Sequence, residues 1–228
     1  MTLSLAKRLL SSLLICLSAL LLGNGSFAQG IEQSQAGTYK IVSEKSDIRL
    51  LAYRGGVLST FGHNHVVSVS DLTGTIVLEP KLQGSRIEFV VQVNKLVVDD
   101  AEVRRQEGKE FAKQPSQSDI KGTRANMLGE QLLNAAQFPT IKVTGVSGPT
   151  SDGKSAQISI TTELLGRHVK LTLPASLKIA GKQLEASGTR NLTHEELGLK
   201  PFSALMGALR VASKMKLKYR IVAEMATE

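Results

Sequence analysis

Residues 214–221 alternate strictly between basic and apolar side chains. The basic side chains are those of Lys214, Lys216, Lys218 and Arg220, and the apolar side chains are those of Met215, Leu217, Tyr219 and Ile221. Successive side chains of a β-strand point to opposite faces of the sheet. The pattern therefore predicts a strand that buries one face and exposes the other, which is typical of antiparallel sheets.

The same period of two recurs along most of the chain. It is found at residues 48–53, 72–78 and 87–94, and again in shorter runs between 141 and 192. Turn-forming residues separate these runs, among them Pro80, the Ser-Asp-Gly-Lys sequence at 151–154 and the Ala-Gly-Lys sequence at 180–182. Many short strands joined by such turns predict an all-β sandwich or barrel with one or two short helices.

Residues 119–136 differ, because their apolar residues have helical spacing. The apolar stripe consists of Met127, Leu128, Leu132 and Leu133. Ser118 or Asp119 can cap the first turn, and the segment ends at Phe138-Pro139, since the residue before a proline is disfavoured in a helix. We expect this helix to close one end of a barrel. The preceding residues, 101–118, are charged and polar and have no clear period.

The first residues have the order of an export signal. Lys7 and Arg8 precede an apolar run at 9–22, and the small residues that follow end at Ala28. The run is shorter than the roughly 20 residues of a membrane-spanning helix, so we expect a signal peptide at 1–28, cleaved near Ala28, and a periplasmic protein. An uncleaved anchor is the alternative. Residues 29–38 then form a flexible N-terminus, and residues 39–228 form a single domain.

Removal of the signal would also remove Cys16, the one cysteine of the chain. The mature protein would then contain no disulfide and no cysteine-based metal site. Its stability must come from its core, and roughly 200 residues is enough for one domain with a large core.

The chain is basic, with a formal net charge of +8, and it stays basic when Lys7 and Arg8 leave with the signal. A basic exported protein can contact the headgroups of an anionic membrane or bind an anionic ligand. The basic face at 214–220 is one such surface, although the solvated face of an outer strand has the same composition. Nucleic acid is excluded as a partner, because recognised motifs are absent and aromatic residues are scarce.

Two of the four histidines, His63 and His65, lie one residue apart after Phe61-Gly62. In a strand, both would point to the same side. Three interpretations stay open. Together with Asn64, the two histidines could hydrogen-bond a ligand at the mouth of a cavity. They could instead fix a tight loop, or they could bind a metal ion such as zinc or copper.

A metal site at His63 and His65 would need at least one further ligand. His194 is the main candidate, and the other candidates are His168, Glu195 and Glu196. Thr193 could instead cap a short helix that starts at His194. The segment could also be a structured loop between two strands.

Sequence motifs for catalysis or cofactor binding are absent. The chain has no Gly-x-Ser-x-Gly nucleophile elbow, no phosphate-binding glycine loop and no His-Glu-x-x-His zinc motif. We therefore expect a binding protein without catalytic residues and without a cofactor. The competing hypothesis is a metal-dependent enzyme or redox protein that uses His63, His65 and His194.

Three motifs occur in an order that is known from one protein family. Residues 39–46 are similar to an opening Tyr-x-Ile-Asp-x-x-x-Ser strand, and residues 72–76 are similar to a Phe-x-Gly-x-Ile strand. Residues 127–141 are similar to a place where a helix ends before a Tyr-Pro-x-Ile-x-Phe strand. In this order, the three motifs resemble the YceI-like family of exported polyisoprenoid-binding proteins, and the resemblance covers about residues 39–223. The Gly62-His63-Asn64-His65 element replaces the usual Gly-x-Phe and marks a divergent branch.

This resemblance implies an extended, antiparallel, lipocalin-like β-barrel around an apolar tunnel, with a helix near one end. The ligand would be a polyisoprenoid or another long-chain lipid, held by a carrier or sequestering protein. His63, Asn64 and His65 would contact its head group. The candidate lining residues lie on strand faces that would point inward, and they are Ile76, Phe89, Val91, Val143, Leu171, Leu217 and Tyr219. A homodimer and a structural role in a membrane complex are further hypotheses.

Overall fold

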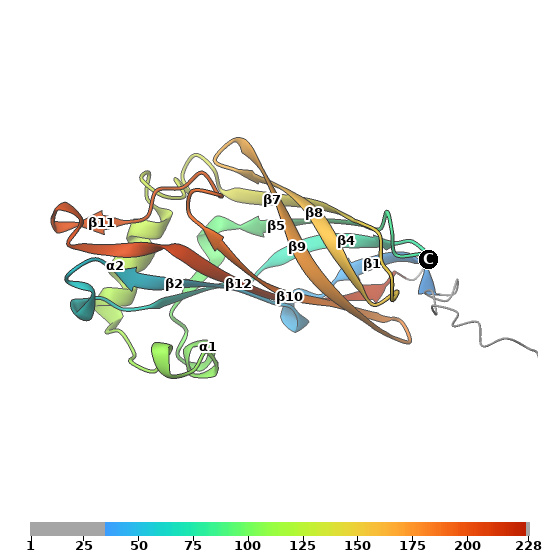
Figure 1. Ribbon diagram of the computed structural model, residues 1–228, viewed down its shortest axis with the longest axis horizontal. Coiled ribbons are helices and arrows are strands. Elements are labelled where there is room, and N and C mark those ends of the chain that lie inside the picture. Colours follow the sequence, from blue (N-terminus) through green and yellow to red (C-terminus); the bar gives the residue numbers. More distant parts are fainter. Residues whose placement is uncertain (1–34, 227–228) are drawn as a thin grey trace, which may run out of the picture.

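The computed structural model describes residues 35–226, so the predicted signal peptide and most of the predicted flexible N-terminus lie outside the described residues. In the described part, eight antiparallel strands close into an elongated barrel (Figure 1). In their order around the barrel, they are β1 (Gly37–Ile41), β4 (Leu72–Leu78), β5 (Arg86–Gln92), β7 (Thr140–Ser147), β8 (Ser155–Leu164), β9 (Arg167–Ala180), β10 (Gln183–Thr193) and β12 (Leu209–Met225). The first strand begins at Gly37, slightly before the predicted domain boundary at Tyr39. The all-β, lipocalin-like barrel expected from the sequence is confirmed.

Further strands extend one end of the barrel. They are β2 (Asp47–Gly55), β3 (His65–Val69) and β6 (Leu96–Val98), which continue the sheet beyond β12. The length of β12, 17 residues, makes this possible, because its first part pairs with β2 and its last residues pair with β1. The short strand β11 (Ser203–Ala204) pairs with the start of β12. Figure 1 shows this hairpin and the end of β2 at the opposite end of the molecule from the C-terminus.

The strands β9 and β10 pair over only part of their length. Their shared register covers residues 176–180 of β9 and 183–187 of β10. Beyond it, β9 continues along β8, and β10 continues along β12. Two side chains connect β9 to other elements there: Tyr219 of β12 donates a hydrogen bond to the carbonyl oxygen of Pro174, and Arg167 donates one to the carbonyl oxygen of Gly198, in the loop after β10, at 2.8 Å. We call this stretch, residues 167–174 and 188–193, the β9–β10 seam.

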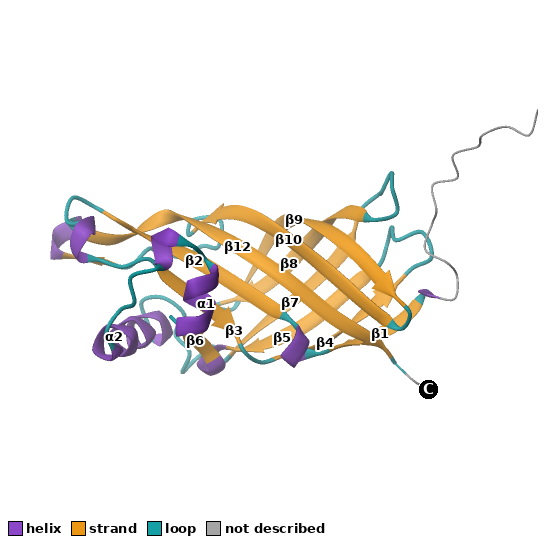
Figure 2. Ribbon diagram, turned by 90° about the horizontal axis from the view of Figure 1, so that it is seen from below, coloured by secondary structure: helices purple, strands orange, loops and turns teal. Residues whose placement is uncertain are grey.

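Two α-helices, α1 (Ala101–Gln106) and α2 (Gln117–Leu128), lie outside the barrel wall near its extended end (Figure 2). Ser116 caps α2 and forms a capping box with Asp119, since each side chain accepts a hydrogen bond from the backbone N–H of the other. The predicted helix at 119–136 is therefore correct in its first part and wrong at its end. Gly129 is extended, and the residues that follow it form turns.

The helix α1 lies in the polar segment where the sequence showed no period. Asp100 caps it by accepting hydrogen bonds from the backbone N–H groups of Glu102 and Val103. Short 3₁₀ helices connect the other elements, and they are η2 (Ser43–Lys45), η3 (Ser59–Phe61), η4 (Val93–Lys95), η5 (Lys109–Phe111) and η6 (Leu205–Gly207). Neither α-helix in the described part of the chain is long and apolar enough to cross a bilayer.

Several side chains are packed together inside the barrel near the C-terminus. Tyr39, Leu184 and Ala223 are completely buried there, on β1, β10 and β12, whose registers bring them together. Tyr39 is also held by a hydrogen bond from its hydroxyl to the carbonyl oxygen of Gln35 at 2.6 Å. Leu184 also borders the space inside the barrel, which extends from there toward α2.

Candidate functional site

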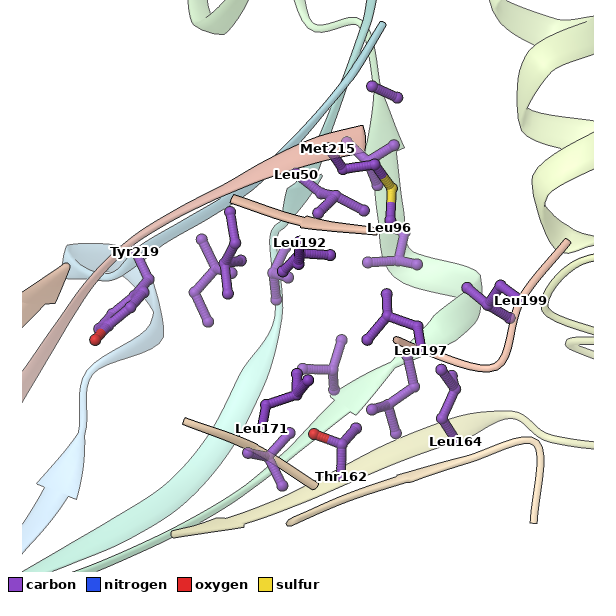
Figure 3. Close-up of a pocket in the computed structure, with 18 of the residues that line it drawn as sticks. Leu50, Leu96, Thr162, Leu164, Leu171, Leu192, Leu197, Leu199, Met215 and Tyr219 are labelled. Atoms are coloured by element: carbon purple, nitrogen blue, oxygen red, sulfur yellow. The ribbon is translucent and has the colours of Figure 1, made fainter. Parts of the chain in front are cut away.

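An apolar cavity of about 690 Å³ occupies the inside of the barrel. Its wall comes from nearly every barrel strand and from β2 and β3 of the extension. Figure 3 shows Leu50, Leu171, Leu192 and Met215 among the side chains that converge on it. A volume of this size is within the range of cavities that hold small-molecule ligands.

The cavity shows which face of the last strand, β12, is the inner one. The apolar set of β12, from Met215 to Ile221, lines the cavity, and the basic set lies on the outside. The same holds for the other candidate lining residues: the structure places Ile76, Phe89, Val91, Val143, Leu171, Leu217 and Tyr219 in the cavity wall. The sequence pattern did not show that this face is the inner one, and contact of these residues with a ligand stays a prediction.

Tyr219 contributes its ring to the cavity wall and directs its hydroxyl into the β9–β10 seam. The hydroxyl donates to the carbonyl oxygen of Pro174. Gly188 makes room for it, since a Cβ atom at that position would lie 2.5 Å from the Tyr219 oxygen. Burial raises the pKa of Tyr219 to about 12. The phenol is therefore neutral and already satisfied, so Tyr219 offers a ligand an apolar surface.

Polar side chains gather where the cavity meets α2. Ser118, Asp119, Thr123 and Asn126 of α2 line it there, together with His63 and His65. Gly122 lies among them and leaves open space, since a Cβ atom there would have no neighbour within 4 Å. We call this region the mouth of the cavity.

A buried carboxylate orients His65 at the mouth. The Nδ1 atom of His65 lies 2.6 Å from Oδ2 of Asp99, whose side chain is fully buried. The other carboxylate oxygen accepts hydrogen bonds from the Val66 backbone N–H, at 2.9 Å, and from the Arg104 guanidinium. Burial alone raises the pKa of Asp99, but these hydrogen bonds and the charges of His65 and Arg104 outweigh it and hold the pKa below its ordinary value.

Arg104 is the fixed cation of this cluster. It is only 2% exposed, and it donates hydrogen bonds to the carbonyl oxygens of Asn64 and Lys113, both at 2.7 Å. Its guanidinium carbon also lies 5.8 Å from the centre of the Phe111 ring. Arg104 thus ties the mouth loop to α1 and to the segment before α2.

This arrangement determines what His65 can do chemically. An ionised carboxylate only accepts hydrogen bonds. Nδ1 of His65 therefore carries a proton and donates a hydrogen bond to Asp99. In the neutral ring, Nε2 is then an unprotonated acceptor. A hydroxyl group on a ligand could donate a hydrogen bond to it.

A comparison of the sequence with known protein families shows which family the chain belongs to. The profile of the YceI-like domain matches residues 39–223. The chain belongs to the YceI-like family. The resemblance expected from its motifs is thereby confirmed. A comparison with curated proteins found no match.

Solved structures show the same YceI-like fold. The chain is similar to BcnA of Burkholderia cenocepacia, with a TM-score of 0.58 and 11% identity, over 82% of this chain and 99% of that one. It is also similar to a polyisoprenoid-binding domain of Saccharophagus degradans implicated in plant cell wall breakdown, with a TM-score of 0.52 and 11% identity, over 82% of this chain and 98% of that one. At such low identity, these likenesses concern the fold.

Asn64 has a structural place in this YceI-like domain. Its side-chain oxygen accepts a hydrogen bond from the backbone N–H of Arg54, and its amide nitrogen donates to the carbonyl oxygen of Glu110, both at 3.0 Å. It is not part of the cavity wall, unlike His63 and His65. Of the three mouth residues expected to contact a head group, the structure therefore brings the two histidines to the cavity.

His63 lies beside His65, with the two ring centres 6.3 Å apart. Burial lowers the pKa of His63 below its ordinary value, and the nearby charge of Lys113 lowers it further. Asp119 acts in the opposite direction but does not outweigh them. The lowered pKa favours the neutral ring of His63, which adds a second polar group to the mouth.

The proposed metal ligands do not come together. Within residues 35–226, no three His, Cys, Asp or Glu side chains are placed to hold a metal ion. His194 also lines the cavity but is buried, and its Nδ1 lies 3.0 Å from the carbonyl oxygen of Ser213. The segment from His194 is a turn rather than the short helix that was one alternative, although Thr193 and Glu196 exchange the hydrogen bonds of a helix cap.

Several cavity residues were missed by the sequence analysis. Leu197, Leu199 and Phe202 belong to the loop between β10 and β11 and reach into the cavity from outside the strands. No period marks them, because a loop has none. Leu50 and Ala52 were visible as an alternating pair in β2, but only the pairing of β2 with β12 shows that their face is the inner one.

Proposed function

We propose that this protein holds a polyisoprenoid or a similar long-chain amphiphile in its barrel. The observation that carries the proposal is the apolar cavity of about 690 Å³, which runs along the inside of the barrel from Leu184 to the polar side chains of the mouth. The likeness to a polyisoprenoid-binding domain supports the ligand class. Each methylene group that moves from water into such a cavity contributes about 0.8 kcal/mol, so the length of the chain is the main source of affinity.

The head group would stay at the mouth, where His63 and His65 line the cavity. A terminal hydroxyl could donate to Nε2 of His65, which Asp99 orients from behind. We infer a binding role without catalysis, because the cavity wall is mainly apolar and offers a ligand burial rather than reacting groups. No observation in the described residues favours the metal-dependent alternative.

The site of action belongs to the proposal as well. The signal-like residues 1–28 support export to the periplasm, where the protein would carry or sequester a lipid that is insoluble in water. The homodimer stays a prediction.

The proposal can be tested on untagged mature protein purified from its own host. Native mass spectrometry should show a bound mass that solvent extraction recovers as a long-chain lipid. If the protein is empty, it should be incubated with a long-chain isoprenoid alcohol and examined again. Failure to retain that alcohol, or a long-chain quinone offered in parallel, would contradict the proposed function.

A further inference from the structure

Large apolar side chains are exposed together at the end of the barrel where the cavity opens. Val57 is 88% exposed, Phe61 77% and Leu205 66%, and Met206 is completely exposed. They lie on two loops, residues 56–62 with η3 and residues 203–209 with η6, which we call the tip. Figures 1 and 2 both show these loops at the end opposite the C-terminus. Exposed apolar side chains that gather in this way mark an interaction surface.

The two loops of the tip form one unit. The backbone N–H of Leu58 donates to the carbonyl oxygen of Ala208 at 2.8 Å. Gly56 has a φ of +88°, and a Cβ atom there would lie 2.4 Å from the same oxygen, so a glycine is required for this close approach. Leu205 and Met206 have φ values of +50° and +53°, which side chains of this kind rarely adopt. The backbone therefore holds apolar residues out in solvent at a cost in strain.

The surroundings of the tip are basic. Arg54 and Arg210 are exposed on the paired strands β2 and β12, and neither is in an ion pair with a described residue. Residues 48–70 and 197–223 contain no aspartate or glutamate. The basic face at 214–220 is the other candidate for contact with an anionic membrane. There, however, Lys218 is paired with Glu107 and Arg220 with Glu185, so part of that charge is neutralised.

The tip is continuous with the cavity. Phe61 and Phe202 are exposed and also line the cavity, and Arg54 and Arg210 lie in the same wall. A lipid that passes from a bilayer into the barrel through this end would not have to cross water, where its chain is poorly solvated. We propose that the tip inserts into the interface of an anionic lipid bilayer and places the mouth of the cavity against the membrane. This inference rests on the proposed function, because it assigns the membrane as the place where the ligand is exchanged.

Insertion of the tip can be followed with a single fluorophore, since the chain contains no tryptophan. The Met206→Trp variant is mixed with vesicles of phosphatidylglycerol and phosphatidylcholine. Its emission should shift to the blue and be quenched by brominated acyl chains, and the shift should decrease at high salt. The matched control is Val146→Trp, at an exposed apolar position on β7 away from the tip, which should not respond. Equal emission of Met206→Trp with and without vesicles would overturn the proposal.

A second experiment separates docking from ligand binding. The double variant Val57→Ser/Met206→Asn changes side chains that do not line the cavity, and asparagine tolerates the left-handed backbone of position 206. We expect it to float with anionic vesicles about tenfold less than the unchanged protein, because it lacks two apolar contacts with the membrane. It should still retain a long-chain isoprenoid alcohol delivered from ethanol. Unchanged flotation overturns the docking surface, whereas loss of alcohol retention by the unchanged protein overturns the proposed function.

Discussion

Asp99 determines the arrangement of the cavity mouth at the scale of single residues. It adopts a φ of +56° and is 2% exposed, yet its carboxylate serves His65, Val66 and Arg104 at once. The sequence analysis found His65 and missed Asp99 and Arg104. A histidine pair is visible in a local pattern, whereas Asp99 reaches His65 across 34 positions, and only the folded chain brings them together.

Substitution of Asp99 by asparagine should destabilise the fold. The Asp99→Asn variant leaves the Arg104 guanidinium buried without its counter-charge, which costs about 3–5 kcal/mol when a buried pair is broken from one side. Urea unfolding would measure the loss. The comparison variant is Asp71→Asn, which breaks the exposed pair with Lys95 and should cost no more than about 1 kcal/mol. Equal stability of Asp99→Asn and the unchanged protein would show that the cluster contributes little.

The lowered pKa of His63 predicts a pH dependence of stability. The unfolded chain binds a proton at His63 near the ordinary value of about 6.5, before the folded protein does. Stability from this residue is therefore present above about pH 6.5 and decreases as the pH falls through the lowered pKa of the folded state. The His63→Gln variant should lose less unfolding free energy than the unchanged protein between about pH 7.5 and about pH 5.5. An identical loss in both proteins would contradict the role of His63.

Strands were more predictable than helices and loops at the scale of elements. The period of two in β12 is a property of every strand with one buried face, so the residues that share a face could be identified from the sequence, although not which face is the inner one. The end of α2 could not, because Leu132 and Leu133 kept the helical spacing beyond Gly129. Leu133 is indeed buried, but from a turn. Apolar residues of a turn therefore had the same spacing as the apolar stripe of a helix.

The alternation of β9 can be tested with two neighbouring substitutions. Leu171 points into the cavity, and Thr172 is exposed on the outside. A Leu171→Trp variant should fill part of the cavity and weaken retention of a long-chain isoprenoid alcohol about tenfold or more, since at least two methylene groups would be displaced. The Thr172→Trp variant should retain it as well as the unchanged protein. Both would be compared by native mass spectrometry over a range of ligand concentrations. Undiminished binding by Leu171→Trp would place the ligand elsewhere.

In the whole molecule, the inside of the barrel is partly packed and partly hollow. This difference could not be predicted from the sequence, because packed and cavity-lining strand segments carry the same apolar alternation. Tyr39 and Ala223 are completely buried near the C-terminus, whereas Leu171 and Leu217 face empty space. Packing, rather than composition, thus decides where a ligand can lie.

Truncation of a packed side chain and of a cavity-lining one should have unequal effects. The Tyr39→Ala variant leaves a new void in a packed region and should lower the free energy of unfolding by about 3–5 kcal/mol. The Leu171→Ala variant should cost less than about 2 kcal/mol in ligand-free protein, because its side chain already borders a cavity and has fewer contacts to lose. Chemical denaturation of both variants would measure the difference. Similar losses would mean that the cavity is collapsed in solution.

The β9–β10 seam affects how far the barrel can widen. Along residues 167–174 and 188–193, the wall is held by the Tyr219 hydroxyl and the Arg167 guanidinium instead of a ladder between backbones. Spreading the strands there would stretch two side-chain contacts and break no rung of the sheet. We therefore expect the barrel to widen most easily along this line, so that ligands of different thickness fit without unfolding the wall that encloses them.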